Sequence, residues 1–137
     1  MKNSWKISLI LLLFVAGFLA ASCGNSQAQT GLLQGGVTIG PLTPVEIPGQ
    51  DLPVPPEVFS SRKILVYDAT GEKLIKEVAI NQIDQTANGY YGVLLEPGTY
   101  TVDLDNTSIG GANLPKKITI SPGKTVILDI DIDTGIR

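Results

Sequence analysis

The side chains of this sequence offer few ways to do covalent chemistry. Histidine is absent from all 137 residues, and the one cysteine is Cys23. Without an imidazole, the chain has neither a Ser-His-Asp triad nor a Cys-His pair, and it has no histidine ligand for zinc or copper. We therefore expect no enzymatic activity and no cofactor.

Cys23 directly follows a short apolar segment at the start of the chain. Lys2 and Lys6 come first, an apolar run continues to Phe18, and the small residues Ala20-Ala21-Ser22 precede the cysteine. The run is shorter than the roughly 20 apolar residues that span a bilayer. A basic start, an apolar middle and small residues at the end are instead typical of a secretory signal peptide, here residues 1–22.

The segment Leu19-Ala20-Ala21-Ser22-Cys23 resembles the lipobox of bacterial lipoproteins. The resemblance implies that Cys23 is acylated with palmitate-like chains and becomes the mature N-terminus, anchored to a bacterial membrane outside the cytoplasm. The lipobox usually has leucine three residues before the cysteine, where this chain has Ala20. The alternative is an ordinary secretory signal that is cleaved after Ala21-Ser22.

The remaining chain has the size of one domain. Loss of Lys2 and Lys6 with the signal changes the formal charge from −3 to −5, which argues against a nucleic-acid partner. With one cysteine there is no intrachain disulfide, so the core alone must stabilise the fold. The small, polar residues 23–33 predict a flexible tether, and residues 34–137 the domain.

Alternating apolar and polar residues predict an all-β domain with seven short strands. The expected strands are 34–40, 62–69, 73–80, 89–96, 99–105, 115–121 and 125–132. Such one-sided strands bury their apolar faces when two sheets pack together. The sequence therefore predicts a seven-stranded antiparallel Greek-key β-sandwich, and a closed barrel is the alternative.

A proline-rich segment, residues 41–60, separates the first two expected strands and holds six of the nine prolines. Proline lacks the N–H that a central strand donates, so we expect an extended, exposed crossover between the two sheets. The alternative is a polyproline II segment that docks a partner.

The stretch from Gly89 to Val102, with its Pro97-Gly98-Thr99-Tyr100 turn, resembles carboxypeptidase regulatory-like domains. Those domains share a prealbumin-like sandwich, and the collagen-adhesin B-type repeats have a similar architecture. The resemblance implies an accessory, adhesive or structural role. The prealbumin-like hydroxyisourate hydrolase needs histidines that this chain lacks, and the lysine and asparagine of isopeptide-forming relatives are not at the expected strands.

Three residues of this stretch have a structural role that does not depend on the resemblance. Pro97 presets a turn, Gly98 permits a positive φ, and Tyr100 follows at the position of a tyrosine corner. We expect the Tyr100 ring to be buried and its hydroxyl to donate to a nearby backbone group.

Two stripes of carboxylates are the remaining candidates for metal binding. Alternate residues of a strand share a face, so Asp129, Asp131 and Asp133 line one strand and Asp103 and Asp105 another. Neighbouring stripes would attract a hard cation such as calcium. We favour a solvated acidic face, neutralised by cross-strand lysines, over this calcium site.

We therefore predict a non-catalytic, lipid-anchored module of the bacterial cell envelope, with a structural or protein-binding role and a protein partner. Exposed edge strands would allow copies of the chain to associate. The alternative is a domain that binds a small ligand, carbohydrate or calcium, through loops 81–88 and 106–114. Tyr90 and Tyr91 point to opposite faces, so at least one would be exposed for such binding.

Overall fold

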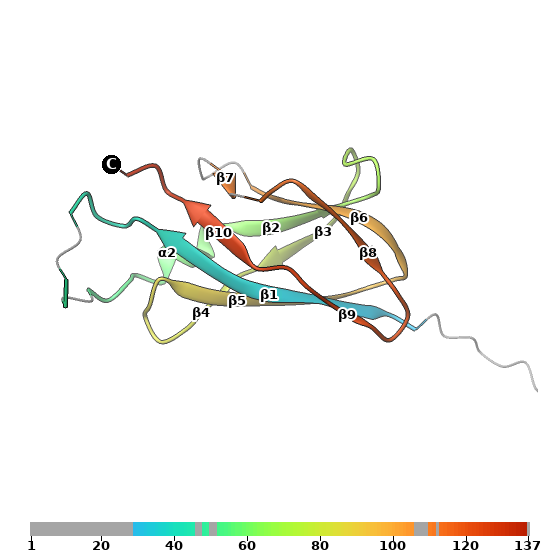
Figure 1. Cartoon of the computed structure of the whole chain (residues 1–137), viewed down its shortest axis with the longest axis horizontal. Helices are drawn as coiled ribbons and strands as arrows, with labels where there is room; N and C mark the ends of the chain where they lie inside the picture. Colours follow the sequence, from blue (N-terminus) through green and yellow to red (C-terminus); the bar gives the residue numbers. More distant parts are fainter. Residues whose placement is uncertain (1–28, 46–47, 50–51, 106–109, 112, 137) are drawn as a thin grey trace, which may run out of the picture.

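The chain folds into two β-sheets packed face to face, with strands making up almost all of the regular structure (Figure 1). The computed structural model describes residues 29–45, 48–49, 52–105, 110–111 and 113–136. Cys23 and the expected signal peptide lie outside the described residues. No helix within these ranges is long and apolar enough to cross a membrane.

One sheet, here sheet A, has the order β4-β5-β1-β10-β7, and β9 pairs beside β1 as well. The other, sheet B, has the order β3-β2-β6-β8. The strands of sheet A are β1 (Gly31–Gly40), β4 (Asn81–Gln82), β5 (Asn88–Leu95), β7 (Gly110–Gly111), β9 (Thr125–Ile127) and β10 (Ile130–Asp133). Those of sheet B are β2 (Lys63–Tyr67), β3 (Leu74–Ala79), β6 (Gly98–Leu104) and β8 (Lys116–Ile120).

The core lies between the sheets and is built by the alternation that the sequence displays. Along β5 every second residue is buried, and Tyr91, Val93 and Leu95 all point inward. Within the described residues, the core contains no buried polar or charged residue. The prediction of an all-β sandwich is therefore confirmed.

Two details of the predicted sheet were wrong. The described residues form ten strands rather than seven, because the two-residue strands β4 and β7 add to the sheet edge and the last expected strand is divided. The sheet is also not wholly antiparallel, because β1 runs parallel to both β9 and β10. Side-chain alternation records which face is buried, but it carries no information about which strand is the neighbour.

The domain also begins earlier than predicted. β1 starts at Gly31, within the expected tether 23–33, and Leu33 is fully buried. Leu32 and Leu33 supply the apolar side chains, and β1 pairs with β5 along its length from Gly31 to Thr38. The polar character of the preceding residues concealed this start.

The last expected strand divides into β9 and β10 where it passes the glycines of β1. A Cβ on Gly35 would lie 1.9 Å from the Leu128 carbonyl oxygen, so only glycine permits this approach. The same oxygen accepts a hydrogen bond of 2.7 Å from the buried Tyr91 hydroxyl. The Gly36 N–H donates to Asp129 Oδ1 at 2.8 Å instead of to a backbone carbonyl. Side chains thus replace ladder bonds at the break.

The proline-rich segment carries the chain from β1 in sheet A to β2 in sheet B. The sequence predicts that this segment is extended and exposed throughout, and that prediction is wrong in part. A short helix, α2 (Glu57–Ser60), forms within it, and its Phe59 is 1% exposed. Val54 is buried as well, because the two apolar side chains close one end of the core.

Candidate functional site

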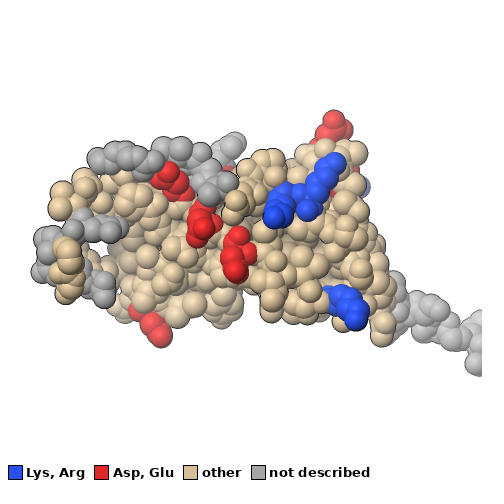
Figure 2. All heavy atoms as spheres, viewed as in Figure 1, with Lys and Arg blue, Asp and Glu red and all other residues tan. Residues whose placement is uncertain are grey.

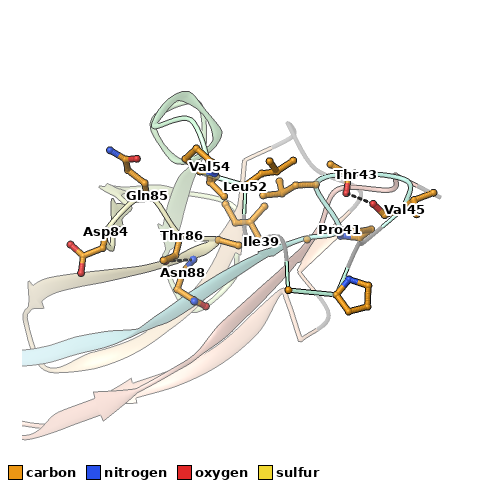
Figure 3. Close-up of a pocket in the computed structure, with 16 residues that line it drawn as sticks. Ile39, Pro41, Thr43, Val45, Leu52, Val54, Asp84, Gln85, Thr86 and Asn88 are labelled. Carbon is orange, nitrogen blue, oxygen red and sulfur yellow. Dashed lines mark hydrogen bonds between the residues drawn. The ribbon is translucent and has the colours of Figure 1, made fainter.

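A groove opens at the end of the sandwich where β1 ends (Figure 3). One wall is the proline-rich segment, and the other is the turn between β4 and β5. The cavity has a volume of about 920 Å³, within the range of small-molecule sites, and is open to solvent on one side. Its described lining includes Ile39, Pro41, Leu52, Val54, Asp84 and Asn88.

The β4–β5 turn is held in an unusual backbone conformation. Asp84 and Gln85 have φ values of 44° and 57°, in the left-handed region that non-glycine residues rarely adopt. Thr86 fixes the turn, because both its N–H and its hydroxyl donate to the Ile83 carbonyl. Ile83 in turn donates its N–H to the Asn88 carbonyl at 2.9 Å. Strained residues of this kind persist only where the surrounding bonds determine them.

The side chain of Gln82 joins the two walls. Its Nε2 donates to the Val54 carbonyl at 2.8 Å and to the Thr86 carbonyl at 3.0 Å. The Val54 N–H donates to the Gln85 carbonyl at 2.8 Å, so Val54 is bonded to this turn through both of its backbone polar groups. The base of the groove is therefore a preformed feature.

The upper part of the groove is apolar and exposed. Val45 and Leu52 lie on the proline-rich wall, and their exposed fractions are 74% and 64%. The hydroxyls nearby are already engaged, since Thr43 Oγ1 donates to the Val45 carbonyl at 3.0 Å. Asp84 is the one ionisable residue among the described lining. This combination suits binding through apolar contact and backbone hydrogen bonds. Among the lining residues that the structure describes, no nucleophile is bonded to a side-chain base.

One of these two walls, the β4–β5 turn, belongs to a loop that the sequence offered as part of an alternative small-ligand site. Residues 81–88 were expected to line it, and Asp84 to Asn88 do so. The other expected loop, 106–114, falls largely outside the described residues. The proline-rich segment was considered only as a polyproline II docking segment and not as a wall of this groove. The bond from Gln82 to the Val54 carbonyl was not predicted, because it joins residues 28 positions apart.

The two acidic stripes do not lie side by side in the described structure. Asp103 lies on β6 in sheet B, whereas Asp131 and Asp133 lie on β10 in sheet A, so the two stripes are in different layers. Asp129 and Asp103 each accept a backbone N–H, from Gly36 and Leu104 respectively. Within the described ranges, no three acidic, cysteine or histidine side chains gather closely enough to hold a metal.

The turn at Pro97 joins β5 in sheet A to β6 in sheet B. The Tyr100 hydroxyl donates to the Glu96 carbonyl at 2.9 Å, the kind of contact expected of a tyrosine corner. The ring is only partly buried, however, and Gly98 has a φ of 159°, close to extended backbone. Gly98 is the first residue of β6 and pairs with Ile120, which explains why it does not adopt a left-handed turn conformation.

The two adjacent tyrosines of β5 do face opposite ways. Tyr91 is 1% exposed and Tyr90 is 53% exposed. Burial raises the pKa of the Tyr91 hydroxyl well above its usual value, and the negative charge of Asp129 raises it further. The Tyr91 hydroxyl is therefore a structural donor at any physiological pH.

Comparisons with known proteins give no family for this chain. No family model matches the sequence, and no curated protein matches it. Among solved structures, a DUF3823 family protein from Parabacteroides merdae is similar over 77% of this chain, with 19% identity and a TM-score of 0.42. GBS52, the minor pilin of Streptococcus agalactiae, is similar over 77% of this chain, with 16% identity and a TM-score of 0.42. The matches cover 46% and 45% of those two chains, so this chain spans less than half of either.

Proposed function

We propose that this protein is a lipid-anchored, extracytoplasmic binding module that presents its groove to a protein partner of the bacterial envelope. The observation that carries the proposal is that the N-terminal end of β1 and the groove lie at opposite ends of this strand. The chain enters β1 at Gly31, on the side of Cys23, and leaves it at Gly40, which lines the groove. Ten residues of strand separate the two by roughly 30 Å.

This arrangement supports a display role. An acyl chain on Cys23 would hold the Gly31 end near the membrane, and the groove would lie at the opposite end of β1. An apolar, preformed and half-open groove suits a segment of another protein better than a fully enclosed small molecule. The chain has no histidine and its one cysteine lies outside the domain, so we propose no catalytic activity.

The anchor is tested with the full-length chain expressed in a bacterium. The wild-type protein should incorporate labelled palmitate and remain with the membrane after carbonate washing, whereas Cys23→Ser should do neither. Equal labelling of the two proteins would refute the anchor.

The groove is tested by site-specific photo-crosslinking. A photoreactive amino acid at Leu52 should trap a protein neighbour in intact cells. The matched control is the same group at Ile75, an exposed apolar residue of β3 in sheet B. Identical products from both sites, or none from Leu52, would contradict a partner in the groove.

A small ligand is the second candidate, because the cavity volume of about 920 Å³ is large enough for a saccharide. Calorimetric titration of the purified mature protein with oligosaccharides, and with calcium in a separate arm, distinguishes this from a protein partner. Saturable heat that is lost in Gln82→Ala would favour the ligand.

A further inference from the structure

The outer face of sheet A changes from polar and acidic residues near the groove to apolar residues near Gly31. β1 lies between β5 and the β9–β10 pair, so its outward residues each have a neighbour on both sides. From the groove end towards Gly31, the rows read Asn88–Thr38–Asp131, then Tyr90–Gly36–Asp129, then Gly92–Gln34–Ile127, and finally Leu94–Leu32–Thr125.

The apolar side chains gather at the Gly31 end of this face. Leu94 is 60% exposed, Ile127 is 69% exposed, and Leu32 lies beside Leu94 across the strands. Tyr90 marks the boundary, with the aspartates beyond it. We call Leu32, Leu94, Ile127 and Tyr90 the apolar patch. Figure 2 shows acidic side chains over β10 and a basic side chain near the end of β9.

The opposite face at the same end of the sandwich is different. The outward residues of β8 in sheet B are Lys117 and Thr119, and Thr119 pairs with Thr99. Leu74 and Ile75 on β3 of sheet B are also partly exposed, at 43% and 44%, but less so than Leu94 and Ile127.

The length of chain between the patch and Cys23 limits what can cover it. Seven residues, 24–30, separate Cys23 from Gly31. Even a fully extended chain of that length reaches only about 28 Å. A lipid on Cys23 would therefore keep Leu32 and its neighbours within about 28 Å of the bilayer surface.

We propose that the apolar patch docks onto the lipid bilayer, so that the domain lies with the Gly31 half of sheet A against the membrane. The inference rests on the lipid anchor proposed above. Leu94, Leu32 and Ile127 enter the interfacial layer, and Tyr90 lies at its boundary, where an aromatic ring with a polar tip is favoured. The patch is too small to bind strongly alone, but the anchor supplies a high local concentration of membrane.

Tryptophan fluorescence tests the inference, because the mature chain has no tryptophan once Trp5 is removed. Leu94→Trp places a probe in the patch, and Thr119→Trp is the matched control on the opposite face at the same end. Each full-length variant is expressed, processed and reconstituted as the mature lipoprotein into phosphatidylcholine vesicles. These vesicles carry no net charge, and a second set has brominated acyl chains that quench tryptophan.

Bromolipid should quench the probe in Leu94→Trp and leave Thr119→Trp unchanged. Adding Ile127→Ser to Leu94→Trp should weaken docking about ten-fold and restore most of the emission. Equal quenching of the two probes, or none in Leu94→Trp, overturns the proposal. A blue shift that grows with protein concentration in vesicle-free detergent would identify a second copy as the occupant, and this also overturns it.

Failure of the anchor is recognised separately. A chain that is not acylated does not sediment with the vesicles, and this outcome refutes the proposed lipid anchor. A chain that sediments but whose Leu94→Trp probe is not quenched is anchored without docking, which refutes only the inference made here.

Discussion

Two tyrosine hydroxyls bond to backbone carbonyls at places where the sheets are interrupted, and their surroundings differ. Tyr91 donates to Leu128, which is 37 residues away, inside the core. Tyr100 donates to Glu96, which is four residues away, at the surface. Water can replace the second hydroxyl but has no access to the first. The same hydrogen bond should therefore have very different importance at the two positions.

The largest effect should come from breaking the buried junction through its backbone. Gly35→Ala places a Cβ 1.9 Å from the Leu128 oxygen and must displace β9 or β10. We expect a loss of about 3 kcal/mol in the free energy of unfolding, measured by urea denaturation. Gly92→Ala is the matched control, because its Cβ has no neighbour closer than 3.8 Å. Equal losses for the two variants would show that the close approach is unimportant.

Tyr91→Phe should be the next most damaging change. It leaves the Leu128 carbonyl without its hydroxyl donor in a site closed to water, at a cost of about 2 kcal/mol. The measurement is again the midpoint and slope of urea unfolding. A loss no larger than that of Tyr100→Phe would remove the distinction between the two tyrosines.

Alkaline pH should weaken the same junction. The pKa of Tyr91 is raised in the folded state, by burial first and by Asp129 second, above the value of 10.0 for a free tyrosine. The folded state then holds its proton more tightly than the unfolded state. The stabilisation from this difference is complete below pH 10 and falls as the pH rises, by at most about 1.4 kcal/mol per pH unit. Subtraction of the Tyr91→Phe profile isolates this group, and parallel profiles would contradict it.

Tyr100→Phe should have the smallest effect of the series. The Glu96 carbonyl can accept a hydrogen bond from water once the hydroxyl is gone, so we expect a loss of about 1 kcal/mol or less. Thermal unfolding would detect it. An unchanged melting temperature would show that this corner contributes nothing, and a loss as large as that of Tyr91→Phe would show that it is closed to water.

The contrast also shows which features the sequence could predict. The contact of Tyr100 spans four residues and follows a Pro-Gly turn, so local signals were enough to expect it. The alternation of β5, β6 and β8 likewise located the core residues. Nothing local shows that Tyr91 meets Leu128, or that Gly35 must be small, because both depend on the parallel placement of β9 and β10 beside β1.

The groove was predictable only in part for the same reason. Polar residues 81–88 indicated a loop, and that loop does line the groove. Its second wall depends on Gln82 reaching Val54, 28 residues earlier in the chain. A bond of that separation leaves no periodic pattern in either segment.

The central position of β1 has a consequence for how the molecule assembles. β1 is flanked by β5 on one side and by β9 and β10 on the other, and Val37 pairs with Ile130, 93 residues later. A chain that emerges from its N-terminus presents this apolar strand first and completes its pairing last. Such non-local pairing slows folding and leaves one side of the strand open in the interval. We therefore expect a molecular chaperone that holds extended apolar segments to improve the yield of native protein.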